Sequence, residues 1–249
     1  MSSLAMTLLL GTALASPQQS YDQGLTALRE GRHEVARDHL LDAVEQGGAD
    51  PHVYHALGNA LYRTGDKGGA TAAWRRGQRL APRNGDIAAN LDRVRKQRED
   101  RLPAPSLAPW AFFWMAFLSP RDGAILASAF SVLALGGAFV RTSLRRRGRP
   151  GPVVGIETWL GAVLALLMAL STQAAVQSDR GVVIRADEVR ARSALGPEGV
   201  ELFALHAAAE ASLLEQAGDH VLIGLDDERK GWVSADAVVL TDPSAPFPR

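Results

Sequence analysis

Cysteine is absent from this chain of 249 residues. Its absence excludes disulfide bonds, thiol catalysis, and zinc or iron–sulfur sites with cysteine ligands. It does not identify the compartment, because an exported protein need not contain disulfides. An excess of charge of either sign is also missing, since 27 basic and 27 acidic residues cancel. This balance argues against a protein that binds nucleic acid or another polyanion through bulk charge.

Catalytic sequence signatures are missing as well. The chain contains no G-x-S-x-G nucleophile elbow and no phosphate-binding P-loop. His33-Glu34 begins like the zinc motif H-E-x-x-H, but Arg37 stands where the second histidine is required. His52 and His55 are one helical turn apart, without a well-placed third metal ligand. We therefore expect no enzyme activity, no cofactor and no bound metal.

The first hydrophobic stretch lies at residues 1–15. Its apolar run ends in Ala13-Leu14-Ala15, a small-x-small pattern typical of signal-peptide cleavage sites. The run is too short to cross a bilayer as a mature helix. We interpret it as a secretory signal peptide. Because no basic residue precedes the run, a buried N-terminal helix is the alternative.

Residues 17–101 contain a pattern that recurs after 34 residues. The recurring positions pair Gly24 with Gly58, Ala27 with Leu61, Gly31 with Gly65, Ala36 with Ala70, Leu40 with Trp74 and Ala43 with Gly77. The second copy, with Pro82 at its close, resembles the tetratricopeptide (TPR) repeat, a pair of antiparallel helices. In this interpretation Gly58 and Ala70 are small where the helices touch. Gly65 permits the turn between the helices, and Pro82 stops the second helix.

In the same interpretation Leu57, Leu61 and Trp74 fill the seam between the two helices. Residues 86–101 predict one more amphipathic helix, with Ile87, Leu91 and Val94 on its apolar face, which suits a terminal cap. Two repeats are fewer than the roughly three that a stable array normally needs. Either the cap or a partner must therefore complete the unit.

TPR arrays usually bind peptides on the face built by the first helix of each repeat. The resemblance assigns that face to Tyr21, Leu25, Arg29, His55, Asn59, Tyr62, Arg63, Arg93 and Lys96. A groove of aromatic and basic residues would suit an acidic peptide or a terminal carboxylate. The alternative is that these residues are the solvated surface of a small solenoid.

Two uncharged or nearly uncharged stretches follow a linker rich in proline and aromatic residues at 102–120, which predicts an interfacial segment. Residues 123–140 and 153–176 are candidate transmembrane helices. The loop between them, residues 141–151, contains Arg141, Arg145, Arg146, Arg147 and Arg149. The positive-inside rule places this loop in the cytoplasm, near anionic lipid headgroups, and both flanking domains outside it.

Small residues recur along the second candidate span, at Gly161, Ala165 and Ala169. Such a stripe is typical of a close contact between transmembrane helices. The sequence leaves open whether the contact is with the first span or with another protein.

Residues 178–241 change to short β-like runs separated by turn residues, which predict a small barrel. The predicted strands are 181–184, 188–192, 199–205, 211–214, 220–225, 231–234 and 237–240, and residues 242–249 form a tail. Gly231-Trp232-Val233 resembles the signature of bacterial SH3-like domains, in which the tryptophan packs against the barrel. Such domains typically bind peptides or cell-wall fragments. Residues 177–249 carry 7 basic and 13 acidic side chains, which disfavours an anionic polymer as ligand.

The order of the segments predicts a multi-domain membrane protein with a TPR solenoid, a two-helix transmembrane hairpin and an all-β SH3-like barrel. This order resembles the BatE-like members of the Bat aerotolerance operon family. The resemblance implies a bacterial inner-membrane scaffold with two periplasmic domains. Its implied partners are von Willebrand A-domain membrane proteins and, indirectly, a MoxR-type AAA+ ATPase, in envelope or oxidative-stress tolerance. The alternative is a peptidoglycan-binding anchor or sensor that acts through the SH3-like domain.

Overall fold

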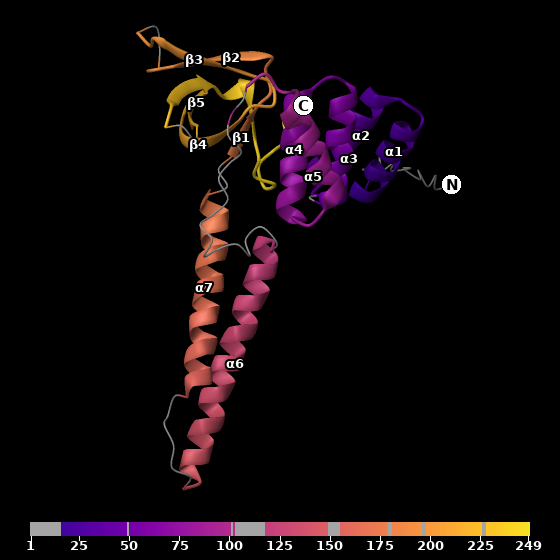
Figure 1. Ribbon diagram of the computed structural model, residues 1–249. Helices are drawn as coiled ribbons and strands as arrows, with labels where there is room; N and C mark the ends of the chain where they lie inside the picture. Colours follow the sequence, from indigo (N-terminus) through magenta and orange to yellow (C-terminus); the bar gives the residue numbers. More distant parts are fainter. Residues whose placement is uncertain are drawn as a thin grey trace, which may run out of the picture.

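The computed structural model describes residues 16–48, 50–100, 102, 118–148, 155–178, 181–195, 198–225 and 228–249. Within these residues, seven helices precede an antiparallel sheet of seven strands. Figure 1 shows α1–α5 as one group beside the sheet, while α6 and α7 form a long pair that extends away from both. The predicted signal peptide and nearly all of the predicted linker lie outside the described residues.

The first five helices, which we call the helical layer, follow the predicted period. They are α1 (Pro17–Arg29), α2 (His33–Glu45), α3 (Pro51–Arg63), α4 (Lys67–Leu80) and α5 (Gly85–Gln97). The starts of α1, α3 and α5 are 34 residues apart, as are those of α2 and α4. The residues before the odd helices are Ser16, Asp50 and Asn84, and the side chain of each accepts a hydrogen bond from a backbone N–H of the first turn. These caps satisfy amide groups that otherwise lack a partner.

The seam between α3 and α4 has the predicted residues in the predicted roles. A Cβ atom on Gly58 would lie 2.4 Å from Trp74 Nε1, so no side chain fits there. Leu57 is fully buried and Leu61 is 1% exposed. Gly65 has a φ of +93°, which glycine adopts without strain. The buried face predicted for the last helix is confirmed too, since Ile87, Leu91 and Val94 on α5 are all buried.

The long helices are α6 (Pro120–Arg146) and α7 (Ile156–Ser178). Ser119 and Asp122 start α6 with a reciprocal capping box. Among the described residues, one helix, spanning Arg121–Arg146, is long and apolar enough to cross a membrane. Thr158–Leu170 in α7 is a shorter apolar stretch.

The arginine cluster is not wholly a loop. Arg141, Arg145 and Arg146 continue α6, and Arg147 is its C-terminal cap. Arginine is a good helix former, and the helix ends before Gly148, which has a φ of +79°. Arg149 and the rest of the predicted loop, up to residue 151, lie outside the described residues.

The small residues of α7 contact α6 rather than remaining free. A Cβ atom on Gly161 would lie 3.2 Å from Ala134 Cβ, and Ala165 is 9% exposed. Ala169 is exposed and takes no part. The stripe therefore joins the two long helices at two of its three positions. Large apolar side chains face outward along both helices, for example Phe139 at 73% exposure.

The strands lie close to their predicted places. They are β1 (Gly181–Ile184), β2 (Glu188–Arg192), β3 (Glu201–His206), β4 (Glu210–Ala217), β5 (His220–Gly224), β6 (Lys230–Ser234) and β7 (Val238–Leu240), with a short 3₁₀ turn at Ala235–Ala237. Their order in the sheet is β3-β2-β6-β5-β4-β1-β7. In the described residues the sheet is open, with β3 and β7 at its edges, and the predicted closed barrel is not seen. The β7 edge lies against α4 instead, so the helical layer covers it.

The Gly231-Trp232-Val233 signature lies on β6, where neighbouring residues alternate between faces. Gly231 and Val233 are buried, and a Cβ atom on Gly231 would lie 2.7 Å from Ala191 Cβ on β2. Trp232 is half-buried on the other face, in register with Leu222. Strand alternation therefore assigns the position in the buried cluster to Val233, and Trp232 lies outside that cluster.

Candidate functional site

Part of the C-terminal segment belongs to the hydrophobic core of the helical layer, while the sheet has a second core of its own. Val183, Ala208, Val239 and Phe247 are buried in the same cluster as the core residues of α1–α5. Figure 1 shows the contact, with β1 and the β7 edge beside α4. Sequence reasoning left open what completes an array of two repeats. In the structure the sheet and the residues that follow it pack on α4.

The first turn of α4 approaches β1 without an intervening side chain. A Cβ atom on Gly68 would lie 2.3 Å from the carbonyl oxygen of Ile184 and 2.5 Å from Arg185 Cα. Gly69, the next residue, has its own N–H bonded to the Asp66 carboxylate. Sequence reasoning overlooked this pair of glycines. Two glycines in the first turn of a helix are a detectable signal for close backbone contact.

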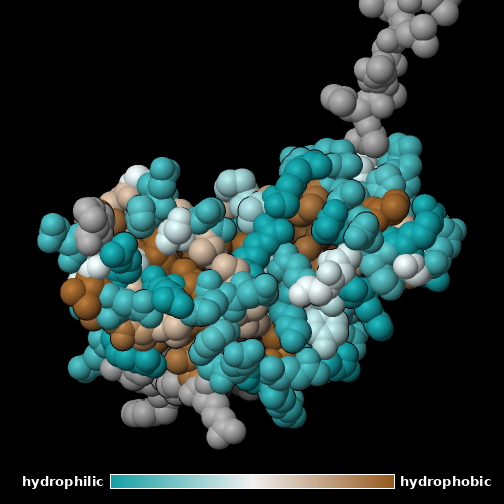
Figure 2. All heavy atoms as spheres, turned by 90° about the horizontal axis from the view of Figure 1, so that it is seen from above, coloured by the Kyte–Doolittle hydropathy of each residue, from teal (hydrophilic) through white to brown (hydrophobic). Residues whose placement is uncertain are grey.

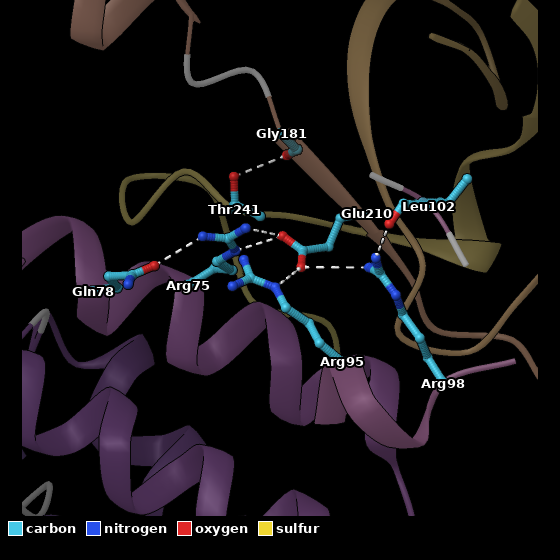
Figure 3. Close-up of polar contacts among 8 residues, drawn as sticks. All are labelled: Arg75, Gln78, Arg95, Arg98, Leu102, Gly181, Glu210 and Thr241. Carbon is cyan, nitrogen blue, oxygen red and sulfur yellow. Dashed lines mark hydrogen bonds and ion pairs between the residues drawn. The ribbon is translucent and has the colours of Figure 1, made fainter. Parts of the chain in front are cut away.

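A buried carboxylate joins the sheet to two helices. Glu210 begins β4, and its side chain is 10% exposed. It accepts hydrogen bonds from Arg75 on α4 and, at 3.1 Å, from Arg95 on α5, and Arg98 Nη1 lies 3.9 Å away (Figure 3). Burial raises the pKa of the Glu210 carboxyl, but the charges of Arg75 and Arg95 outweigh burial, so its pKa lies below the usual value. Glu210 therefore stays ionised and holds the junction together.

Further polar contacts reinforce this junction. Arg98 donates to the carbonyl oxygen of Leu102, and burial lowers the pKa of its guanidinium. Thr241 Oγ1 donates to Gly181 O at 3.1 Å, tying the end of β7 to β1 (Figure 3). On the other side of α4, Arg185 Nε donates to Asp66 at 2.8 Å. None of these residues was predicted as functional. Thr241 and Gly181 are 60 residues apart and Arg185 and Asp66 are 119 apart, so local sequence patterns do not reveal these pairs.

The predicted binding residues lie on α1, α3 and α5. We call the following set the odd-helix face: Tyr21, Leu25, His55, Asn59, Tyr62, Asn90 and Gln97. Asn90 Nδ2 donates to Asn59 Oδ1 at 3.0 Å and lies 3.2 Å from His55 Nε2. Tyr62 donates to Gln97 Oε1 at 2.9 Å. These contacts bring side chains of α3 and α5 together into one polar cluster.

The pKa of His55 is consistent with a neutral ring in this cluster. Burial lowers its pKa, as does the neighbouring His52, while Asp86 opposes the shift. A neutral ring can accept the Asn90 hydrogen bond at Nε2, and the Asn59 amide lies 3.5 Å from the same nitrogen. The cluster is therefore uncharged near neutral pH and offers amide and imidazole groups.

Asn90 and Gln97 were not predicted from the sequence, because the resemblance assigned Arg93 and Lys96 of the cap helix to the binding face. Asn90 follows Asn59 by 31 residues and Gln97 follows Tyr62 by 35. The 34-residue period points to Arg93 and Lys96 instead, so repeat phase alone does not identify Asn90 and Gln97.

The predicted cationic residues lie in solvent around this face and take no part in its polar cluster. Arg29, Arg63, Arg93 and Lys96 are exposed, and Lys96 pairs with Asp92 of its own helix at 2.6 Å. Tyr21 and Leu25 are half-buried and pack against the helical core. Burial and the nearby Asp50 raise the pKa of the Tyr21 hydroxyl. The structure thus unites the aromatic and amide residues and leaves the arginines in solvent.

A cavity of about 560 Å³ lies where the helical layer meets the sheet segment. Its lining includes Lys67, Arg185 and His206, with Asp66 and Asp187. A hydrogen bond to Asp100 raises the pKa of the His206 ring. Figure 2 views the molecule from above, where hydrophobic side chains appear among hydrophilic ones over the sheet. The mixture of both charges gives the cavity no preference for an anion or a cation.

Comparison of the chain with protein-family models, curated proteins and solved structures finds no match. Within the described residues, no group of three or more histidines, aspartates and glutamates is placed to hold a metal ion. Function must therefore be inferred from the residues and their geometry.

Proposed function

We propose that this chain is a membrane-anchored, non-enzymatic scaffold that binds a protein partner through the odd-helix face. In this proposal α1–α5 are two TPR-like repeats with a capping helix, α6 and α7 form a two-span hairpin, and the sheet is an SH3-like domain. The observation that carries the proposal is the polar cluster of His55, Asn59 and Asn90 with Tyr62 beside it.

The repeat assignment is supported by the spacing of equivalent residues. The capping residues Ser16, Asp50 and Asn84 recur every 34 residues, and Gly31 and Gly65 both have positive φ at the turns. Identical turns and caps give helix pairs of similar geometry, which stack side by side. The sheet then takes the place of a third repeat on α4.

The membrane assignment is supported by the exposed apolar surface of α6 and α7. Leu135, Phe139 and Trp159 are 71%, 73% and 64% exposed, which is costly in water over a long helix pair. The helical layer and the sheet lie at one end of this pair, and Arg145–Arg147 lie at the other (Figure 1). With the arginines in the cytoplasm, both domains would be periplasmic in a bacterial inner membrane.

The ligand class follows from the side chains of the odd-helix face. Amide groups such as those of Asn59 and Asn90 can both donate to and accept from a peptide backbone. The exposed Arg63 and Arg93 on the same helices can pair with acidic side chains or a terminal carboxylate of the ligand. An extended acidic segment of a protein partner fits this arrangement.

The order of the segments supports a place among the BatE-like scaffolds of the Bat aerotolerance family. Its partners would then be von Willebrand A-domain membrane proteins and, through them, a MoxR-type AAA+ ATPase. The process served would be envelope or oxidative-stress tolerance.

Co-purification from crosslinked native membranes tests the proposal. Arg63→Ala combined with Asn90→Ala should reduce partner recovery by about tenfold, equivalent to ~1.4 kcal/mol of binding free energy. Both substitutions remove contacts without opening the core. The matched control, Arg37→Ala with Gln46→Ala, changes an arginine and an amide on α2 and its cap and should leave recovery intact. Unchanged recovery in the first variant, with normal membrane insertion, would reject the odd-helix face as the binding site.

A further inference from the structure

Residues 242–249, which we call the tail segment, lie against the helical layer without forming helix or strand. Their contacts reach α2, α3 and α4 through side chains that do not belong to the odd-helix face, among them Asp42, Tyr54 and Arg76. Phe247 is 4% exposed within the helical core cluster, whereas Pro246 and Pro248 beside it are exposed. A single side chain thus anchors a segment whose neighbours remain at the surface.

Arg76 on α4 holds the backbone of this segment. Its side chain is fully buried, yet it has no carboxylate partner among its described hydrogen bonds. Nη1 donates to the carbonyl oxygen of Ala245 at 2.7 Å, and Nη2 donates to that of Pro246 at 3.2 Å. Nε and Nη2 also donate to Leu240 O at 3.0 and 2.9 Å. A buried guanidinium needs such acceptors, so the carbonyls of the chain replace its hydration.

Aromatic rings complete the surroundings of Arg76. Its Cζ atom lies 4.8 Å from the ring centroid of Phe247 and 5.9 Å from that of Tyr54. Tyr54 also donates its hydroxyl to Pro243 O at 3.0 Å. The guanidinium therefore gains cation–π contacts from one ring of the helical layer and one ring of the tail segment.

The end of the tail segment is held by charges. Arg249 donates to Asp42 at 2.7 Å and to the two oxygens of Glu45 at 2.6 and 2.7 Å, both on α2. These hydrogen bonds raise the pKa of the Arg249 guanidinium and lower that of the Glu45 carboxyl. Arg185 Nη1 donates to Pro248 O at 3.3 Å and to Arg249 O at 3.1 Å.

The pattern of these contacts is that of a receptor with its peptide. Side chains of the helical layer and of Arg185 bond the backbone carbonyls, one aromatic residue enters the core, and a terminal charge meets opposite charges. Three prolines in the segment, Pro243, Pro246 and Pro248, restrict its conformation, which lowers the entropy lost on binding. Proline-rich segments are recognised by other domains through such exposed carbonyls and aromatic contacts.

We propose that α2, α3 and α4 form a second peptide-binding site, independent of the odd-helix face, whose ligand is an extended segment with prolines flanking a phenylalanine and an arginine two residues after it. The tail segment occupies the site in cis. A second copy of this chain can supply the same segment in trans, because copies anchored in one membrane share its plane. Exchange of tail segments would then link neighbouring copies without a new interface.

A cleavable version of the full chain tests this site. A protease recognition sequence between Thr241 and Asp242 would allow the folded protein in detergent to be nicked. A fluorescent peptide of residues 242–249 should then exchange into the nicked protein at one peptide per chain. Arg76→Met should weaken its binding by about tenfold or more, since hydrogen bonds from a charged donor are lost. The control Arg37→Met, an arginine of α2 that pairs with the adjacent Asp38, should have no effect.

A change in the peptide itself avoids any effect on folding of the chain. The peptide with Phe247→Ala should compete at least about tenfold less well than the native peptide. A tagged, nicked chain should also retain an intact, untagged copy, and excess native peptide should release it. Equal binding of native and scrambled peptides, or no binding to a nicked protein with an unchanged thermal transition, would overturn the proposal. Failure to retain the intact copy would overturn the exchange between copies.

Discussion

Glu210 brings a negative charge into the junction between the sheet and the helical layer. Three arginines from α4, α5 and the residue after α5 surround it. Removing the charge of one partner leaves the buried cations without a counter-charge, which is strongly destabilising. Replacing the whole ionic group with apolar residues does not leave such a charge behind. The junction therefore depends on this one carboxylate more than on any single apolar contact around it.

Glu210→Gln should lower the free energy of unfolding by roughly 3 kcal/mol, because Arg75, Arg95 and Arg98 lose their counter-charge. The folded-state pKa of Glu210 is lowered, so its contribution is present above the unfolded value of 4.5 and is lost as the pH falls through the folded value. Denaturant unfolding of both proteins should therefore differ near pH 7 and converge in acid. Glu215→Gln, an exposed change on the same strand, serves as the control. An equal loss in the control, or a difference that persists in acid, would contradict this role.

The roles of single residues could be predicted where they depend on residues close by in the sequence. Gly58 and Gly65 could be assigned from repeat spacing, because close helix contact and a left-handed turn each require glycine at a fixed position. Arg76 could not be assigned. In sequence it is one of two adjacent arginines on a helix, and its burial depends on carbonyl groups more than 160 residues later.

Helices and strands were predictable because their ends carry chemical signals. The 34-residue period and the glycine turns indicated α1–α5, and alternation with turn residues placed all seven strands within a few residues. The pairing of strands at the edges of the sheet was harder to predict. Alternation shows which side chains share a face, but it does not tell whether the edge strands meet, and here β7 meets α4 instead.

The pairing of α6 with α7 can be tested at a single contact. A Cβ atom on Gly137 would lie 3.1 Å from Thr158 Oγ1, whereas Gly136 has no atom within 4 Å. Gly137→Cys with Thr158→Cys should therefore form an intramolecular disulfide on mild oxidation in membranes, because the Cβ atoms can reach bonding distance. Protection from a thiol-reactive polymer measures the yield. The pair Gly136→Cys with Thr158→Cys should not form the bond, and similar yields would contradict the packing described.

At the scale of the whole molecule, the sequence indicated the separate segments but not the contacts that join the two flanking domains. The two flanking domains looked separate because two long apolar helices divide them in the chain. The structure joins them through contacts such as Arg75–Glu210, which are 135 residues apart. Patterns of apolar residues are local, so they cannot show which surfaces of two domains meet. The acidic character of the sheet segment was a clue, because the arginines of α4 and α5 provide its partners.

The proposed topology has a direct test, which the absence of cysteine makes simple. Single substitutions Ala88→Cys on α5, Ser212→Cys on β4 and Thr142→Cys near the end of α6 each introduce one exposed thiol. A membrane-impermeant maleimide added to intact spheroplasts should label the first two and not the third, since the arginine-rich end is expected inside. Lysis should make all three reactive. Labelling of Thr142→Cys before lysis, or of neither domain, would contradict a two-span protein with both domains outside.

The core that the helical layer shares with part of the C-terminal segment also sets an order of events in time. A ribosome makes α1–α5 first, then both long helices, and only afterwards Val183, Val239 and Phe247, which complete the core of α1–α5. Contacts between such distant parts of a chain form slowly. The side of α4 that these residues cover therefore stays open until they have been made. During that interval the helical layer is a natural client for chaperones and proteases, which can act on any chain whose synthesis stops early.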